Sequence, residues 1–87
     1  MLHRKQRLGD LGMDLLTHNA IAGKLEASKS AGWLSDYLVA WRGPSGQLSP
    51  NVTVWRTAER SDDEVRRHIV GQLSGVVAAA NILVAGL

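Results

Sequence analysis

The last twenty residues of the chain, 68–87, contain no Lys, Arg, Asp or Glu, and this uncharged end limits how the chain can fold. It follows the stretch Ser-Asp-Asp-Glu at 61–64, which has the pattern of a helix-capping box. Acidic side chains in a first turn also complement the positive end of the helix dipole. Apolar residues then recur at spacings of four and three from Ile69 to Leu87. The pattern predicts one long apolar helix over 61–87, from about Asp62 to Gly86.

This predicted helix would have a second apolar face. Small and aliphatic residues lie about opposite the main stripe and leave only a narrow polar strip. A helix that is apolar nearly all round is usually buried on two sides. We therefore expect one face to pack on the rest of the domain and the other to form a two-fold homodimer interface. The residues of this expected interface are Gly71, Gly75, Ala78 and Ile82.

The central residues, 33–57, are rich in Trp, Tyr, Val and Thr, which favour strands. Two runs of this kind are joined by a connection rich in Pro and Gly, residues 43–50, which is typical of a hairpin. Because two strands alone are only marginally stable, a helix should cover one face of the pair. The sequence therefore predicts an antiparallel β-hairpin over 33–57 with helices packed on it.

The N-terminal third is predicted to be helical over 8–30, where leucines and His18 are spaced by three, four or seven, with Thr17–Asn19 as an alternative break. Arg4, Lys5 and Arg7 precede any acidic residue, so residues 1–7 are expected to form a flexible basic arm. The predicted fold is a single α+β domain over 1–87. It has an N-terminal helical segment, a two-stranded (alternatively three-stranded) antiparallel β-hairpin and a long C-terminal helix packed on the sheet.

The sequence offers little for catalysis. There is no Cys, which excludes thiolate chemistry and disulfides, and the three His residues are scattered without zinc-binding spacing. Neither a phosphate-binding glycine loop nor a G-x-S-x-G motif is present. The acids at 62–64 are accounted for by helix capping. We therefore expect no enzymatic activity, no cofactor and no metal site.

The uncharged end also raises the question of a membrane span, because Ile69–Leu87 is nineteen residues long and contains a G-x-x-x-G at Gly71 and Gly75. Polar residues interrupt it, and its acid-capped start suits a helix buried in a protein. Residues 8–16 lack the apolar region of a secretory signal. We therefore expect a cytoplasmic protein without a membrane partner.

The hairpin carries the side chains best suited to binding. If Val39 and its neighbours of the same parity meet the helix, the opposite face presents Arg42 and Trp55, a combination that suits protein or nucleic-acid partners. The alternative is that Trp55 lies in the core and the arginines are solvated, and the alternation alone does not choose between the faces. The expected binding residues are Arg42, Trp55 and Arg56, with Arg4, Lys5 and Arg7 adding contacts to phosphate.

The stretch YLVAWRGPSG, with the second strand and the acid-started helix, resembles the arm-type DNA-binding domains of phage integrases. The resemblance covers about 37–70 and rests on the order strand, turn, strand, helix. It would imply DNA binding, but the strands here carry few basic residues. We expect instead a non-enzymatic protein-binding module that regulates or inhibits a partner by occupying its surface, like accessory proteins of phages and mobile elements. The alternative is a weak nucleic-acid-binding protein that uses the basic arm and the hairpin arginines.

Overall fold

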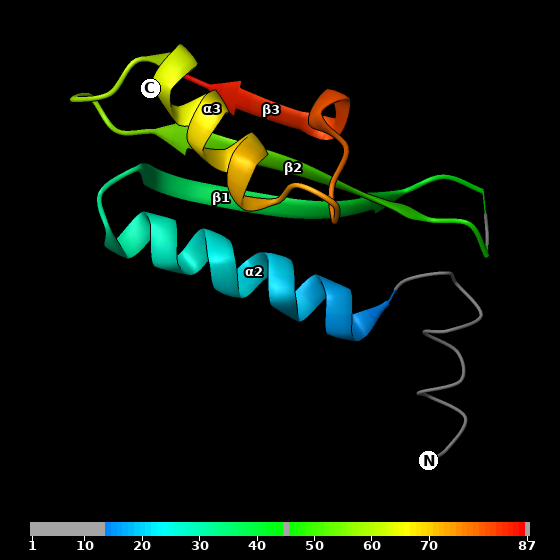
Figure 1. Cartoon of the computed structure of the whole chain (residues 1–87). Helices are drawn as coiled ribbons and strands as arrows, with labels where there is room; N and C mark the ends of the chain where they lie inside the picture. Colours follow the sequence, from blue (N-terminus) through cyan, green and yellow to red (C-terminus); the bar gives the residue numbers. More distant parts are fainter. Residues whose placement is uncertain (1–13, 45, 87) are drawn as a thin grey trace.

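The computed structural model describes residues 14–44 and 46–86, which form a small α+β fold (Figure 1). The fold consists of two helices, a short 3-10 turn and a three-stranded sheet. Strand β1 is antiparallel to β2, and β2 is parallel to β3, so the sheet is mixed with the order β1-β2-β3. The elements are α2 (Leu15–Ser30), β1 (Leu34–Arg42), β2 (Ser49–Arg56), α3 (Asp62–Gln72), the 3-10 turn η1 (Ala79–Asn81) and β3 (Ile82–Ala85).

Helix α2 begins at Asp14, whose carboxylate accepts hydrogen bonds from the amides of Leu16 and Thr17 and so satisfies two free donors of the first turn. Its buried face consists of Ile21, Leu25 and Ser28. The helix runs without a break to Ser30, so the alternative break in its first half does not occur. The predicted arm, 1–7, and the start of the predicted helical segment, 8–13, lie outside the described residues.

The hairpin strands pair with Tyr37 opposite Val54 and Val39 opposite Val52. The register shifts between Leu34 and Asp36, which is a β-bulge in β1. The extra residue matters because it changes the parity of Leu34. Without the bulge its side chain would share the solvent side with Asp36, whereas in the structure Leu34 is buried in the core.

Helix α3 begins as expected, with the hydroxyl of Ser61 accepting from the Glu64 amide and the Glu64 carboxylate accepting from the Ser61 amide. The predicted length of this helix is wrong. It ends at Gln72, and the residues expected to continue it form a turn, η1 and strand β3. The predicted sheet is also wrong in its third strand, since β3 comes from the supposed helix and pairs parallel to β2.

The chain leaves the helical path three residues after α3 ends, at Gly75. Gly75 has a φ of +82°, a left-handed conformation that a continuing right-handed helix excludes. The run from Ile82 to Ala85 is a short aliphatic segment that suits a strand, and its pairing satisfies the backbone groups along the second edge of β2. Arg66 of α3 fastens the new segment by donating hydrogen bonds to the carbonyl oxygens of Ala79 and Ile82.

Both helices pack on the same face of the sheet, called here the inner face. Side chains of α2 and α3 form one core with the strand residues of one parity, which alternate along the strands with residues that face the other side. We call the second side the outer face, and no described element covers it. The core consists of Ile21, Leu25, Leu34, Val52, Val54, Val65, Ile69, Leu73, Val77 and Ile82.

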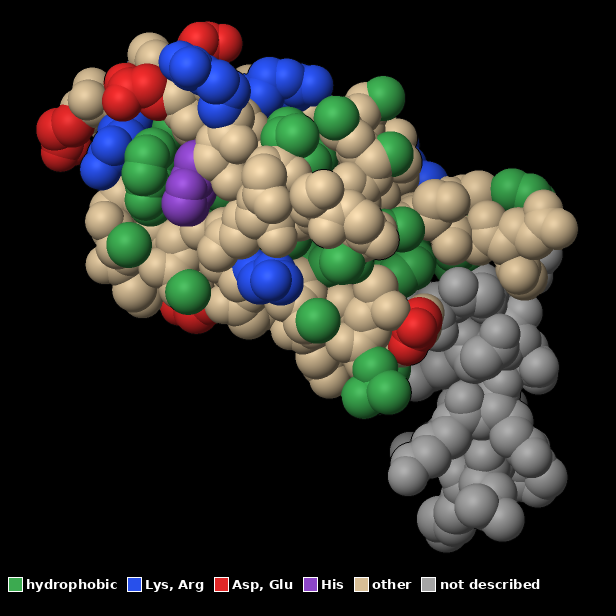
Figure 2. Space-filling model, in the orientation of Figure 1, with side chains coloured by type: hydrophobic (Ala, Val, Ile, Leu, Met, Phe, Trp, Pro, Cys, Tyr) green, Lys and Arg blue, Asp and Glu red, His purple; other side chains and the backbone are tan. Residues whose placement is uncertain are grey.

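Charged side chains on the helix-covered side gather at the end of the molecule where α3 begins (Figure 2). The rest of that side carries few of them. Within the described residues, no helix has both the length and the apolar character needed to cross a membrane.

Candidate functional site

The outer face of the sheet carries exposed apolar side chains on two of its three strands. Leu38, Thr53 and Leu83 are neighbours in one row across the three strands, because Thr53 pairs with both leucines. Leu38 is 55% exposed and Leu83 is 61% exposed. Trp55 stands in the next row, between Asp36 and Ala85, and is half-buried. We call Leu38, Trp55 and Leu83 the outer patch.

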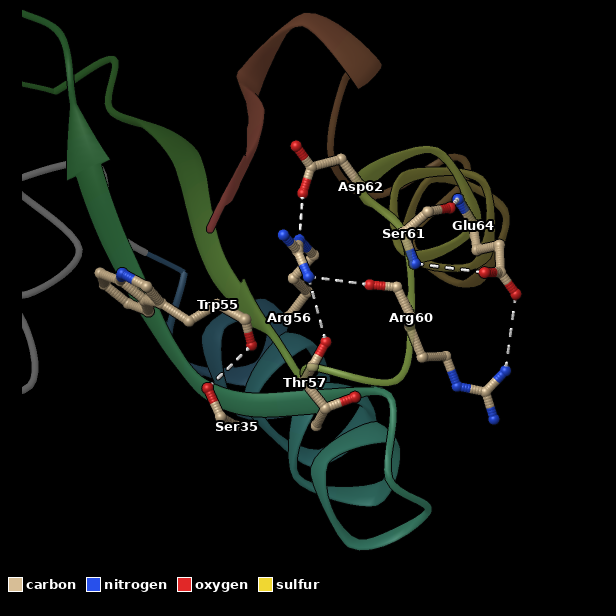
Figure 3. Close-up of polar contacts among 8 residues, drawn as sticks. All are labelled: Ser35, Trp55, Arg56, Thr57, Arg60, Ser61, Asp62 and Glu64. Carbon is tan, nitrogen blue, oxygen red and sulfur yellow. Dashed lines mark hydrogen bonds and ion pairs between the residues drawn. The ribbon is translucent and has the colours of Figure 1, made fainter. Parts of the chain in front are cut away.

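Trp55 and Arg56 point to opposite sides of β2 (Figure 3). The indole of Trp55 projects away from α3, while the Arg56 guanidinium reaches toward α3 and forms an ion pair with Asp62. Arg56 also donates to the carbonyl oxygens of Thr57 and Arg60 at 3.4 and 3.0 Å, which holds the loop before α3 in place. Its guanidinium is thus used within the fold, and the structure does not bring it to the same surface as Trp55.

Arg42 lies on the outer face at the hairpin end of β1. It borders a hollow of about 280 Å³. The hollow is also lined by Thr53 and by Leu83 of the outer patch. Asn51 and Asn81 belong to the same lining. Among the described residues, Arg42 has no acidic partner within 4 Å. The structure therefore places a cation and several hydrogen-bonding groups next to an apolar surface.

The remaining predicted binding residues do not join this site. The expected dimer residues Gly71, Gly75, Ala78 and Ile82 do not share a helix face, because only the first belongs to α3. Ile82 is 3% exposed, so its side chain lies in the core and not on the surface. The arm residues Arg4, Lys5 and Arg7 lie outside the described part of the chain.

A cluster of polar and aromatic side chains connects α2 with α3, and the sequence did not predict it. The indole of Trp33 stacks on the His68 imidazole with ring centroids 4.0 Å apart, and the Arg60 guanidinium lies 3.7 Å from the indole centroid. Burial lowers the pKa of His68, and the positive charge of Arg60 lowers it further. These residues come from three separate stretches of the chain, so no local spacing signals their contact.

The buried hydroxyl of Ser28 lies 3.2 Å from Nε2 of His68, which invites comparison with a serine nucleophile and its base. However, the Ser28 hydroxyl donates its single proton to Oε1 of Gln72. In the hydrogen bond between Ser28 and His68, Nε2 of His68 must therefore be the donor. Gln72 in turn donates to the carbonyl oxygen of Lys24. A histidine that donates to the serine cannot remove its proton, and the hydroxyl is 2% exposed. This cluster links the helices and does not form a nucleophilic site.

His18 is also used structurally, because its Nδ1 accepts a 2.9 Å hydrogen bond from the indole nitrogen of Trp41. In the part of the chain that the structure describes, no three His, Asp or Glu side chains are placed to share a metal ion. The described polar clusters therefore serve packing within the fold, and the outer face is the side of the sheet that no described helix covers.

Comparison with known proteins adds no relative. No family model matches the chain, and no curated protein or solved structure is detectably similar to it.

Proposed function

We propose that this protein is a non-enzymatic binding module that occupies the surface of a partner protein through its outer face. The observation that carries the proposal is the placement of both helices on one side, which leaves the outer patch uncovered by any described element. Single exposed leucines are common on protein surfaces, but aligned apolar side chains that adjoin one another more often mark an interface.

The size of the face sets the expected affinity. The strands have nine, eight and four residues, and at about 4.8 Å between strands and about 3.3 Å rise per residue they give a face of roughly 330 Å². This is roughly two fifths of the ~800 Å² that each partner buries in a standard stable complex. We therefore expect a transient complex with a dissociation constant in the micromolar range, unless other surfaces contribute. The cytoplasm is the proposed setting, where binding domains without disulfides are usual.

A nucleic-acid partner would require several cations on one surface. Among the described strand residues, Arg42 is the cation of the outer face, while Arg56 is engaged with Asp62 on the inner face. The apolar patch also suits protein better than a phosphate backbone. Nucleic-acid binding is therefore treated as an outcome of the test and not as a second proposal.

The proposal is tested by photo-crosslinking from a benzophenone amino acid placed at Leu83, in the cells that make the protein. The matched control places the same group at Leu16, which is 82% exposed on α2 and lies away from the outer face. We expect a discrete protein adduct from position 83 that is absent from position 16. Equal adducts from both positions, or adducts with nucleic acid alone, would reject the proposal.

A further inference from the structure

Resting on the function proposed above, we infer that the partner segment carries a carboxylate that pairs with Arg42 while apolar side chains of the same segment cover the outer patch. The outer face is electrically asymmetric. Within residues 14–44 and 46–86, the charged strand residues on this face are Asp36 and Arg42, at opposite ends of the outer side of β1, roughly 20 Å apart at 3.3 Å per residue.

The two charges differ in how far they are already compensated. Asp36 accepts a 2.8 Å hydrogen bond from the Tyr37 amide and lies 3.9 Å from the ammonium group of Lys29. Arg42 has no such acidic neighbour among residues 14–44 and 46–86. The charge that this face leaves for a partner is therefore positive.

The surroundings of Arg42 suit a carboxylate. The hollow beside it is lined by Thr53 and Asn81, whose side chains carry hydrogen-bond donors, and by Asn51, whose amide donates one hydrogen bond to the carbonyl oxygen of Ser49. A guanidinium supplies paired donors that match the two oxygens of a carboxylate.

The patch and the cation also fix a spacing. Leu38 and Arg42 lie on the same side of β1, four residues apart, which is roughly 13 Å. An extended partner segment would span this distance in about four residues. The inferred ligand is thus a segment of a protein with aliphatic or aromatic side chains and an Asp or Glu about four residues away. A phosphate group could meet Arg42 alone, but it would leave the outer patch uncovered.

The test selects binders from a random linear peptide library displayed on phage, with the full chain as bait. Wild type is compared with Arg42→Glu, with Leu83→Asp and with the matched charge reversal Arg67→Glu, whose side chain is exposed on α3. Circular dichroism first checks that each variant is folded. We expect wild type and Arg67→Glu to enrich acidic residues about four positions from an apolar residue, and Arg42→Glu to lose the acidic residue.

One selected peptide is then compared with its amide twin, in which Asp or Glu is replaced by Asn or Gln. We expect the amide to bind wild type about five- to tenfold more weakly, and to bind Arg42→Glu no worse than the acid does. If peptides require Leu83 but show no acidic preference, the carboxylate inference fails and the proposed function stands. If no enriched peptide depends on Leu83, the proposed function itself fails. Enrichment of acidic residues by Arg42→Glu as well would also overturn the inference.

Discussion

Replacing Gly75 by Ala tests whether the chain leaves the helix after α3. In the structure Gly75 has a φ of +82°, and no atom lies within 4 Å of the position that a Cβ would occupy. The penalty is therefore a pure backbone effect. A left-handed conformation costs an L-residue about 1–2 kcal/mol, and the stiffer unfolded chain returns about 0.4–1 kcal/mol. We expect Gly75→Ala to lower the free energy of unfolding by about 1 kcal/mol.

A continuous helix over 61–87 would give the opposite sign. Gly75 would then sit in the helix interior, where Ala is favoured over Gly by about 1 kcal/mol. Gly23 supplies the control, because it lies within α2 and has open space around its missing Cβ. Gly23→Ala should therefore stabilise the protein by up to about 1 kcal/mol.

Thermal and urea unfolding followed by circular dichroism measure both changes. For a domain of this size, 1 kcal/mol corresponds to a shift in Tm of about 4–8 °C. We expect Tm to fall for Gly75→Ala and to rise for Gly23→Ala. A rise in Tm for Gly75→Ala would refute the turn and restore the long helix.

Further predictions address the cap, the third strand and the response to pH. Ser61→Ala removes the capping hydroxyl and should cost about 1 kcal/mol in urea unfolding. Ile82→Ala should cost about 2–5 kcal/mol because Ile82 is buried, whereas Leu83→Ala should stay within about 0.5 kcal/mol; equal effects would contradict the register of β3. The pKa of His68 is lowered in the fold by burial, so the unfolded chain takes up its proton first. Stability should therefore be complete above about pH 6.5 and decline as the pH falls below it. His68→Gln should remove this decline below about pH 6.5, and an unchanged decline would show that another group causes it.

Local chemistry was enough to predict where several elements begin. The capping box at Ser61 places the start of α3, because its bonds are formed by residues that are near in sequence. Glycine and proline likewise indicate the connection between β1 and β2. The bulge at the start of β1 depends on packing, and no local signal at Leu34 announces it.

The C-terminal error has a physical reason. Apolar spacings of three and four continue past Gln72, but a short aliphatic run such as Ile82–Ala85 fits a buried strand as well as a helix. The choice is made by the open edge of β2, which offers backbone partners from a distant part of the sequence. The spacing of apolar residues along the chain does not show whether a segment will continue a helix or pair with a distant strand.

The candidate site was predictable in part. Alternation along β2 places Trp55 on the opposite face of the strand from both Val54 and Arg56. In the structure Arg56 forms an ion pair with Asp62 on that opposite face. The stacking of Trp33 on His68 joins residues that only the tertiary fold brings together.

The central claim is that the outer face binds a partner protein, and the dissociation constant of the crosslinked partner tests it most directly. The measurement compares wild type, the double variant Leu38→Ala/Leu83→Ala, and Leu16→Ala, whose exposed side chain lies on α2. Removing two leucines from the contact should weaken binding at least tenfold, because each buried leucine contributes about 1.5–3 kcal/mol. The account expects no change for Leu16→Ala. Unchanged affinity in the double variant, with weakening in Leu16→Ala, would contradict it.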